Sequence, residues 1–114
     1  VEGMSFGKMR ALVQILSTEA VKDSEGFSTS RDTVLAEVRA YHEARHVSER
    51  WANRAAFSEA TDLFRFRAIP GVEITTKLFL HCEGCRYDIT SVEDVKGRGM
   101  YVEVLAKKVV ATNG

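Results

Sequence analysis

The run from Lys77 to Leu105 constrains the fold more than any other part of the chain, because it has the pattern of three strands joined by two tight turns. Leu78, Leu80 and Cys82 occupy alternate positions, which is the spacing of a strand with one buried face. Glu83 and Gly84 follow them and have the composition of a two-residue hairpin turn. This part of the chain therefore predicts antiparallel strands.

The second and third strands of this run continue the alternation. Tyr87 and Ile89 are expected to point inward, and a charged turn with two glycines over residues 93–99 precedes the last strand. The core face of the last strand is predicted to consist of Met100, Val102, Val104 and Ala106. Its outward positions are predicted to include Glu103 and Lys107.

The first half of the chain predicts a long, bulged hairpin. Residues 9–18 are apolar and β-prone, with Val13 and Ile15 on one face. Asp23 to Gly26 has turn composition, since Asp and Ser initiate turns and Gly accepts a positive φ. The return strand is predicted over residues 27–30 and 33–38.

A separate strand is predicted from Leu63 to Ile69. Phe64 and Phe66 alternate there with arginines, which indicates one buried and one exposed face. Pro70 and Gly71 end it, because Pro donates no backbone hydrogen bond and Gly permits a sharp turn.

Residues 39–60 have a different composition, rich in Ala, Glu and Arg and poor in β-branched residues. Ser48 is a candidate N-cap, and apolar residues then recur at helical spacing at Trp51, Ala52, Ala55 and Ala56. The segment predicts a loop insertion that contains one α-helix over about residues 48–58. The predicted fold class is mainly β: a small antiparallel barrel or sandwich with this one inserted helix.

The length of 114 residues fits a single domain over residues 1–114. Residues 1–8 are expected to be flexible, and residues 1–3, which precede Met4, are interpreted as a remnant of an expression tag. Lys plus Arg and Asp plus Glu number 16 each, a balance that argues against a dedicated nucleic-acid binder. No apolar run approaches the ~18–20 residues of a membrane helix. Two cysteines and no export signal favour a reducing, cytosolic setting and no membrane partner.

Cys82 and Cys85 form a C-x-x-C motif, which is half of a typical zinc site. His42 and His46 are spaced so that one helix face could present both, so a four-ligand site is a low-probability alternative. The simpler interpretation is that the cysteines flank a hairpin turn, where they could also form a cross-strand disulfide. We therefore predict no metal and no cofactor.

Enzymatic activity has no support in the sequence. There is no Gly-x-Ser-x-Gly elbow, and Gly97 to Gly99 is too short for a phosphate-binding loop and lies between predicted strands. The chain is therefore predicted not to be an enzyme.

Basic residues gather in the predicted insertion. They are Arg39, His42, Arg45, His46, Arg50 and Arg54, opposed only by Glu43 and Glu49. One interpretation is a solvated face. The other is a surface that lies near DNA, because phosphate contacts require only positive charge and reach.

Several short segments, in this order and spacing, resemble the head-tail joining (head-closure) proteins of tailed bacteriophages and prophages. The resemblance covers about residues 6–109, and its segments are Gly7–Arg10, Asp23 with Gly26 and Phe27, Ala36–Val38 and Phe64–Arg67. The closest segments are Arg86–Ile89, Val92–Asp94, Gly97–Arg98 and Val102–Val104. Two features depart from the family pattern, namely Thr33 and Val34, where an aromatic residue is common, and the two cysteines.

The resemblance implies a virion structural protein, a small β-barrel that assembles as a ring under the portal. Such a ring closes the DNA channel and docks the tail, so the implied partners are portal or connector proteins, tail proteins, further copies of this chain and, without sequence specificity, packaged DNA. The implied location is the virion, and the host bacterial cytoplasm during assembly. By analogy with such rings, the segment with Arg39, Arg45, Arg50 and Arg54 is expected to face the channel. Another virion ring protein, such as a tail-completion factor, or a small barrel that binds nucleic acid or a partner remains an alternative.

Overall fold

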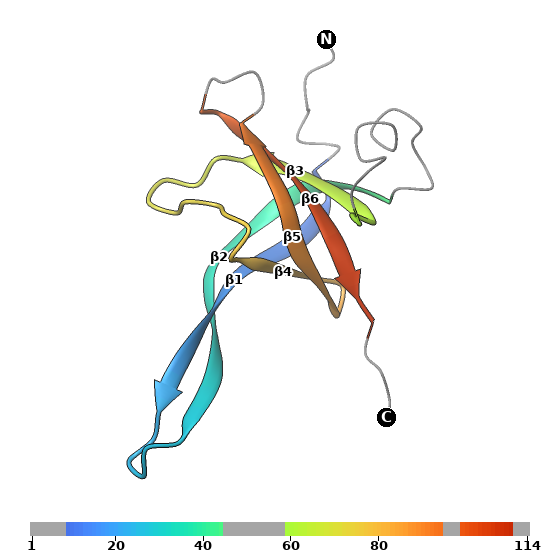
Figure 1. The fold of residues 1–114 in the computed structure, drawn as a ribbon. Coiled ribbons are helices and arrows are strands. Elements are labelled where there is room, and N and C mark those ends of the chain that lie inside the picture. The colour runs from blue at the N-terminus through green and yellow to red at the C-terminus, as the bar shows by residue number, and fades with distance from the viewer. Residues whose placement is uncertain (1–8, 45–58, 95–98, 111–114) are drawn as a thin grey trace.

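The computed structural model describes residues 9–44, 59–94 and 99–110, and these form one closed barrel of antiparallel strands (Figure 1). The strands are β1 (Ala11–Lys22), β2 (Ser28–Ala44), β3 (Asp62–Arg67), β4 (Phe79–Cys82), β5 (Cys85–Asp94) and β6 (Tyr101–Val109). Around the barrel their order is β1-β2-β3-β6-β5-β4. Closure gives every strand a partner on both sides over at least part of its length, which removes sheet edges that would otherwise invite aggregation.

The predicted fold class was wrong in one respect, because the described residues are all β and contain no helix. Residues 48–58, where the helix was predicted, lie outside the described residues. The start of the predicted insertion is strand: β2 continues through Arg39 to Ala44 and pairs with both β1 and β3. Pairing on two sides overrides the weak helix propensity of this Ala- and Glu-containing stretch.

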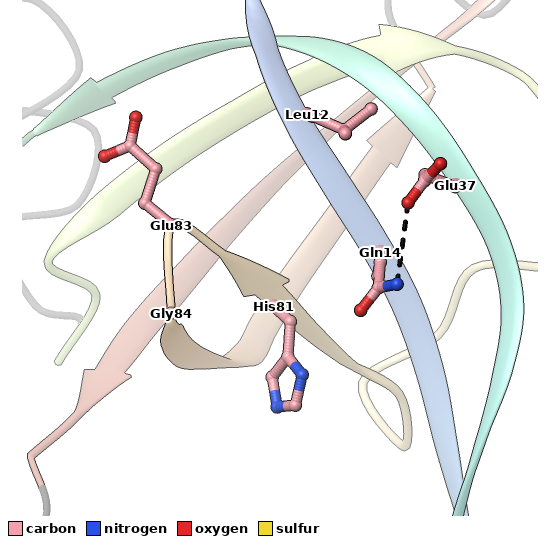
Figure 2. A pocket seen from close by; sticks show the side chains of 6 residues that line it. All are labelled: Leu12, Gln14, Glu37, His81, Glu83 and Gly84. Atoms are coloured by element: carbon pink, nitrogen blue, oxygen red, sulfur yellow. Dashed lines mark hydrogen bonds between the residues drawn. The ribbon is translucent and has the colours of Figure 1, made fainter.

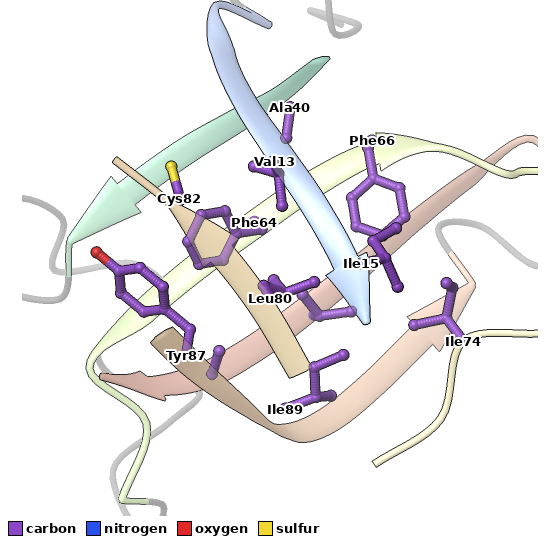
Figure 3. Packing of buried hydrophobic residues seen from close by; sticks show 12 residues of the cluster. Val13, Ile15, Ala40, Phe64, Phe66, Ile74, Leu80, Cys82, Tyr87 and Ile89 are labelled. Atoms are coloured by element: carbon purple, nitrogen blue, oxygen red, sulfur yellow. The ribbon is translucent and has the colours of Figure 1, made fainter. Parts of the chain in front are cut away.

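The core fills the barrel with side chains from alternate positions of every strand (Figure 3). Phe64 and Phe66 of β3 are fully buried at its centre, as the alternation predicted. Around them lie Val13, Ile15, Ala40, Ile74, Leu80, Cys82, Tyr87, Ile89, Val104 and Ala106. Met100 was wrongly placed on the core face, since it lies just before β6 and is 59% exposed.

The outer face of the barrel carries a second, smaller cluster of buried apolar residues. Leu63 and Leu105 point away from the core, yet they are buried together with Ala60 in a second apolar cluster. Next to them on the same strands, the predicted outward residue Glu103 is only 3% exposed. Arg65 Nε donates to Glu103 Oε2 at 2.9 Å, which compensates the buried carboxylate.

Two local devices set the register of the barrel. The turn between β4 and β5 is made by Glu83 (φ 51°) and Gly84 (φ 78°), so both residues have the positive φ of a type I′ hairpin. The β1/β2 pairing shifts between Ile15 and Leu16, and the β5/β6 pairing shifts between Ile89 and Ser91. These bulges bend the strands and help the sheet to close. The bulged first hairpin and the two-residue turn confirm the sequence predictions.

Candidate functional site

The most distinctive surface feature is a two-stranded arm, residues Ser17–Thr33, which projects from the barrel (Figure 1). β1 contacts β4 only as far as Leu16, so beyond that point it pairs with β2 alone. No residue of the arm is buried. Six residues of strand span about 20 Å, so the arm reaches well beyond the barrel wall.

The tip of the arm is held by its own side chains. Asp23 Oδ1 accepts hydrogen bonds from the backbone N–H groups of Glu25 and Phe27, both at 2.9 Å. Gly26 has φ +89°, which suits glycine in this turn. The result is an ordered turn that leaves the Phe27 side chain 65% exposed. The tip of the arm therefore presents one exposed aromatic ring.

A second apolar group lies at the root of the arm. Val34 is 51% exposed and Leu35 is 42% exposed, next to the bulge between β1 and β2. Leu12, farther along β1, is 45% exposed.

The sequence contained a signal for the arm, because residues 17–33 are rich in Ser and Thr and lack the apolar alternation of a buried strand. Polar residues on both faces indicate a ribbon outside the core.

A hollow of about 450 Å³ lies beside β1 on the outer surface of the barrel (Figure 2). Its lining comes from Leu12, Gln14, Glu37, His81, Glu83 and Gly84. Gln14 Nε2 donates to Glu37 Oε2 at 3.5 Å across it. The hollow is open, and most of its lining residues are polar, with two carboxylates and one imidazole.

Of the predicted basic surface, the described residues include only Arg39 among the four arginines. Arg39 lies on the exposed side of β2, and its Nη1 donates to the backbone oxygen of Arg10 at 3.2 Å. Arg45, Arg50 and Arg54 lie outside the described residues, so their orientation toward DNA stays a prediction.

His42 belongs to a different environment from the one the sequence suggested. Its ring is stacked on Phe64, with centroids 4.4 Å apart, and its Nε2 lies 2.6 Å from Asp62 Oδ2. Thr61 Oγ1 donates to Asp62 Oδ1 at 2.6 Å. Burial raises the pKa of the Asp62 carboxyl, but the hydrogen bonds from His42 and Thr61 outweigh it and bring the pKa below its usual value. Sequence reasoning missed this polar cluster, because its members lie 20 residues apart.

Cys82 and Cys85 are free thiols that lie opposite each other across the β4/β5 turn. Cys82 is buried in the core, and Cys85 packs against it. Burial, followed by the charge of Glu83, raises the pKa of the Cys82 thiol, which disfavours the thiolate needed for metal binding or redox chemistry. Within the described residues no group of three His, Cys, Asp or Glu side chains could hold a metal ion. His46, part of the zinc alternative, lies outside them.

Tyr87 completes the polar part of the core. Its ring packs edge-on against Phe64, with centroids 5.0 Å apart. Burial, together with the nearby Asp62 charge, raises the pKa of Tyr87 to about 12, so its phenol stays neutral. Its burial in the packed core indicates a structural role.

A family match agrees with the small closed barrel. The family model for the phage head completion protein matches residues 4–109. The chain belongs to the phage head completion protein family. It is therefore a structural protein of the phage head, and the resemblance found in the sequence is confirmed.

Two solved structures share the fold. The solution structure of protein SF1141 from Shigella flexneri 2a has a TM-score of 0.71 at 13% identity, over 96% of this chain and 100% of that chain. A chain in the virion of a native gene transfer agent particle has a TM-score of 0.54 at 19% identity, over 90% of this chain and 98% of that chain. At these identities the likeness establishes the barrel fold alone.

No curated protein matches the chain. Among the described residues, no helix has the length and apolar character needed to cross a membrane.

Proposed function

We propose that this phage head structural protein joins the head to the tail. Several copies form a ring under the portal after DNA packaging, close the DNA channel and present the surface on which the tail docks. The ring assembles in the host cytoplasm and remains in the virion. Membership of the head completion family supports this proposal.

The observation that carries the proposal is the arm. Residues 17–33 contain no buried side chain, and the tip presents Phe27 at 65% exposure. Such an extension adds nothing to the core packing of a single domain. It is useful to an assembly protein, because the arm can reach a neighbouring molecule.

Electron microscopy of the purified protein mixed with cognate portal rings tests the proposal. We expect an added ring of density at one end of the portal. The matched control is a chain in which residues 18–32 are replaced by Asn-Gly, which keeps the barrel and removes the arm. Portal rings that stay bare with the full-length protein would refute the head-tail role.

We further propose that Arg39, Arg45, Arg50 and Arg54 lie near the packaged DNA. The support is the local cluster of positive charge in a chain whose overall net charge is zero, since phosphate contacts depend on charge rather than on sequence motifs. Reversing Arg45, Arg50 and Arg54 to Glu together should reduce DNA retention in assembled particles. The control reverses three exposed lysines outside this cluster, Lys77, Lys107 and Lys108. Full DNA retention in the arginine variant would contradict this role.

A further inference from the structure

Each strand of the arm has one edge without a partner strand in the described chain. β1 pairs with β4 only from Val13 to Leu16, which leaves its outer edge unpaired from Ser17 to Lys22. β2 pairs with β3 only from Tyr41 to Ala44, which leaves its outer edge unpaired from Ser28 to Ala40 among the described residues. Unpaired backbone N–H and C=O groups on an edge form a template for another strand.

The hydrogen bond that closes the tip shows which backbone groups point outward. Asp23 N donates to Phe27 O at 2.9 Å, so residues 23 and 27 form a hydrogen-bonded pair. Hydrogen-bonded and non-hydrogen-bonded pairs alternate along an antiparallel ladder. The pairs Lys22/Ser28, Ala20/Ser30 and Thr18/Asp32 therefore direct their backbone groups away from the hairpin. They form two regular rows of free donors and acceptors.

Neither a proline nor a bulge interrupts these edges within the arm. The single proline of the chain is Pro70, far from the arm, and the bulge lies at the root between Ile15 and Leu16. β1 and β2 have 12 and 17 residues, longer than most strands in globular proteins. An isolated two-stranded ribbon is only marginally stable in water, so this arm gains from further pairing.

The exposed charges of the arm complement each other across such a pairing. Glu19 on β1 and Arg31 on β2 lie opposite each other, yet neither forms an ion pair within the described residues. On the other face, Thr18 Oγ1 donates to Asp32 Oδ1 at 3.1 Å. When β1 of one copy lies beside β2 of another, a second Glu19 comes next to Arg31, and no row brings like charges together. The charge pattern therefore fits a second copy of this chain.

We propose that, in the ring, the arms of neighbouring copies pair edge to edge, β2 of one copy against β1 of the next. This inference rests on the proposed ring. Copies related by rotation about one axis point all their hairpins the same way, so the strands alternate in direction and every seam is antiparallel. The contact is heterologous, with a different edge on each side, and it closes when the rotation closes. The arms then form one continuous tube without free edges.

Disulfide trapping tests the seam, with two variants that each carry one introduced cysteine in a chain whose native Cys82 and Cys85 are replaced by alanine. Ala20→Cys and Ser30→Cys are mixed on cognate portal rings and oxidised with copper phenanthroline. Across the seam Ala20 and Ser30 would form a hydrogen-bonded pair, whose Cα atoms lie about 5.5 Å apart and therefore within reach of a disulfide. We expect a covalent dimer in the mixture. Two further mixtures, Thr18→Cys with Ser30→Cys and Lys22→Cys with Ser30→Cys, detect a seam whose register is shifted by two residues in either direction.

Each variant alone is the matched control. In a ring of one variant, equivalent cysteines on neighbouring copies are two strand spacings apart, roughly 10 Å, which is too far for a disulfide. Closed rings on the portal without dimers in any mixture would overturn the pairing of the arms and leave the head-tail role intact. Bare portals would overturn both.

A proline scan separates pairing between copies from pairing within the arm. Ser30→Pro removes a backbone N–H that points outward, so the ladder inside the arm stays intact. We expect about tenfold weaker ring association, from a lost hydrogen bond and a steric block at each seam. Ser30→Ala keeps the N–H group and should assemble like the unmodified chain. Equal assembly of the two variants would contradict the proposal.

Discussion

The barrel and the arm are built from the same strands, yet they solve different problems. In the barrel, β1 and β2 alternate apolar and polar residues, and Val13, Ile15 and Ala40 are fully buried. In the arm, the continuation of these two strands has polar residues on both faces and no buried side chain. The bulge between Ile15 and Leu16 marks the boundary.

The difference indicates where folding free energy and assembly free energy are located. Apolar burial is the dominant favourable contribution to folding, and in the described chain it is concentrated in the barrel. The side-chain hydrogen bonds of the arm, such as Thr18 to Asp32, are exposed and local. They order the ribbon but contribute little to global stability. The arm is therefore free to serve association.

The largest test of this division substitutes the same residue type in both regions. Phe64→Ala empties the centre of the barrel and removes contacts with His42 and Tyr87, so it should lower the free energy of unfolding by about 3–5 kcal/mol. Phe27→Ala at the arm tip should change it by less than about 0.5 kcal/mol. Urea denaturation of the monomer measures both values.

In an assay of portal association, Phe27→Ala should have the larger effect of the two variants. Phe27→Ala is expected to weaken portal association, because the exposed ring is lost from the tip. A large loss of monomer stability in Phe27→Ala would show that the arm takes part in the folding core, which would break the comparison.

A second pair of substitutions compares buried and exposed charge. Glu103→Gln removes the buried carboxylate that accepts from the half-buried Arg65 guanidinium, and should cost about 2 kcal/mol of unfolding free energy. Glu19→Gln on the arm should be nearly neutral, because Glu19 is exposed and unpaired among the described residues. Thermal unfolding, followed by circular dichroism, distinguishes them. Equal shifts in melting temperature would contradict the assignment of Glu103 as a structural charge.

The barrel strands could be predicted from the sequence because their patterns are local. The alternation around Phe64 and the Glu83-Gly84 turn were sufficient to place β3, β4 and the start of β5. The extent of β2 was missed, because Arg39 to Ala44 owes its strand conformation to pairing with β1 and β3 rather than to its own propensity. The predicted insertion over residues 39–60 was wrong at its start for the same reason, because residues 39–44 belong to β2.

The candidate surfaces were harder to predict. The half-buried environment of His42 depends on Asp62 and Phe64, two residues of another strand that only the fold brings near. The burial of Glu103 depends in the same way on Arg65. The arm left a readable trace, a Ser- and Thr-rich stretch without apolar alternation. Its unpaired edges, however, follow from the barrel order and not from any residue type.

A third prediction concerns acid stability and isolates the barrel. The folded state lowers the pKa of Asp62 below its usual value of 3.8, so the ionised carboxylate stabilises the fold above pH 3.8 and this contribution is lost as the pH falls through the lower folded-state pKa. Asp62→Asn should lower the unfolding free energy by about 1–2 kcal/mol at pH 6, with a shrinking difference below pH 3.8. Asp23→Asn in the arm turn is the control and should show no such trend in global stability. A difference that stays constant down to pH 2.5 would contradict the role of ionised Asp62.

The smallest predicted effect compares the turn of the barrel with the turn of the arm. Gly84 has φ +78° and Gly26 has φ +89°, and an added Cβ at either position would meet no atom within 4 Å. Alanine at each site is therefore disfavoured by backbone conformation alone, at about 1 kcal/mol. Gly84→Ala should express this cost in the global unfolding free energy, because its turn joins two barrel strands. Gly26→Ala should leave global stability unchanged and accelerate amide hydrogen exchange only in the arm, since a local opening of the ribbon relieves the strain. If Gly26→Ala instead lowers global stability by the same amount, the arm and the barrel unfold as one cooperative unit, and the separation of folding from assembly must be abandoned.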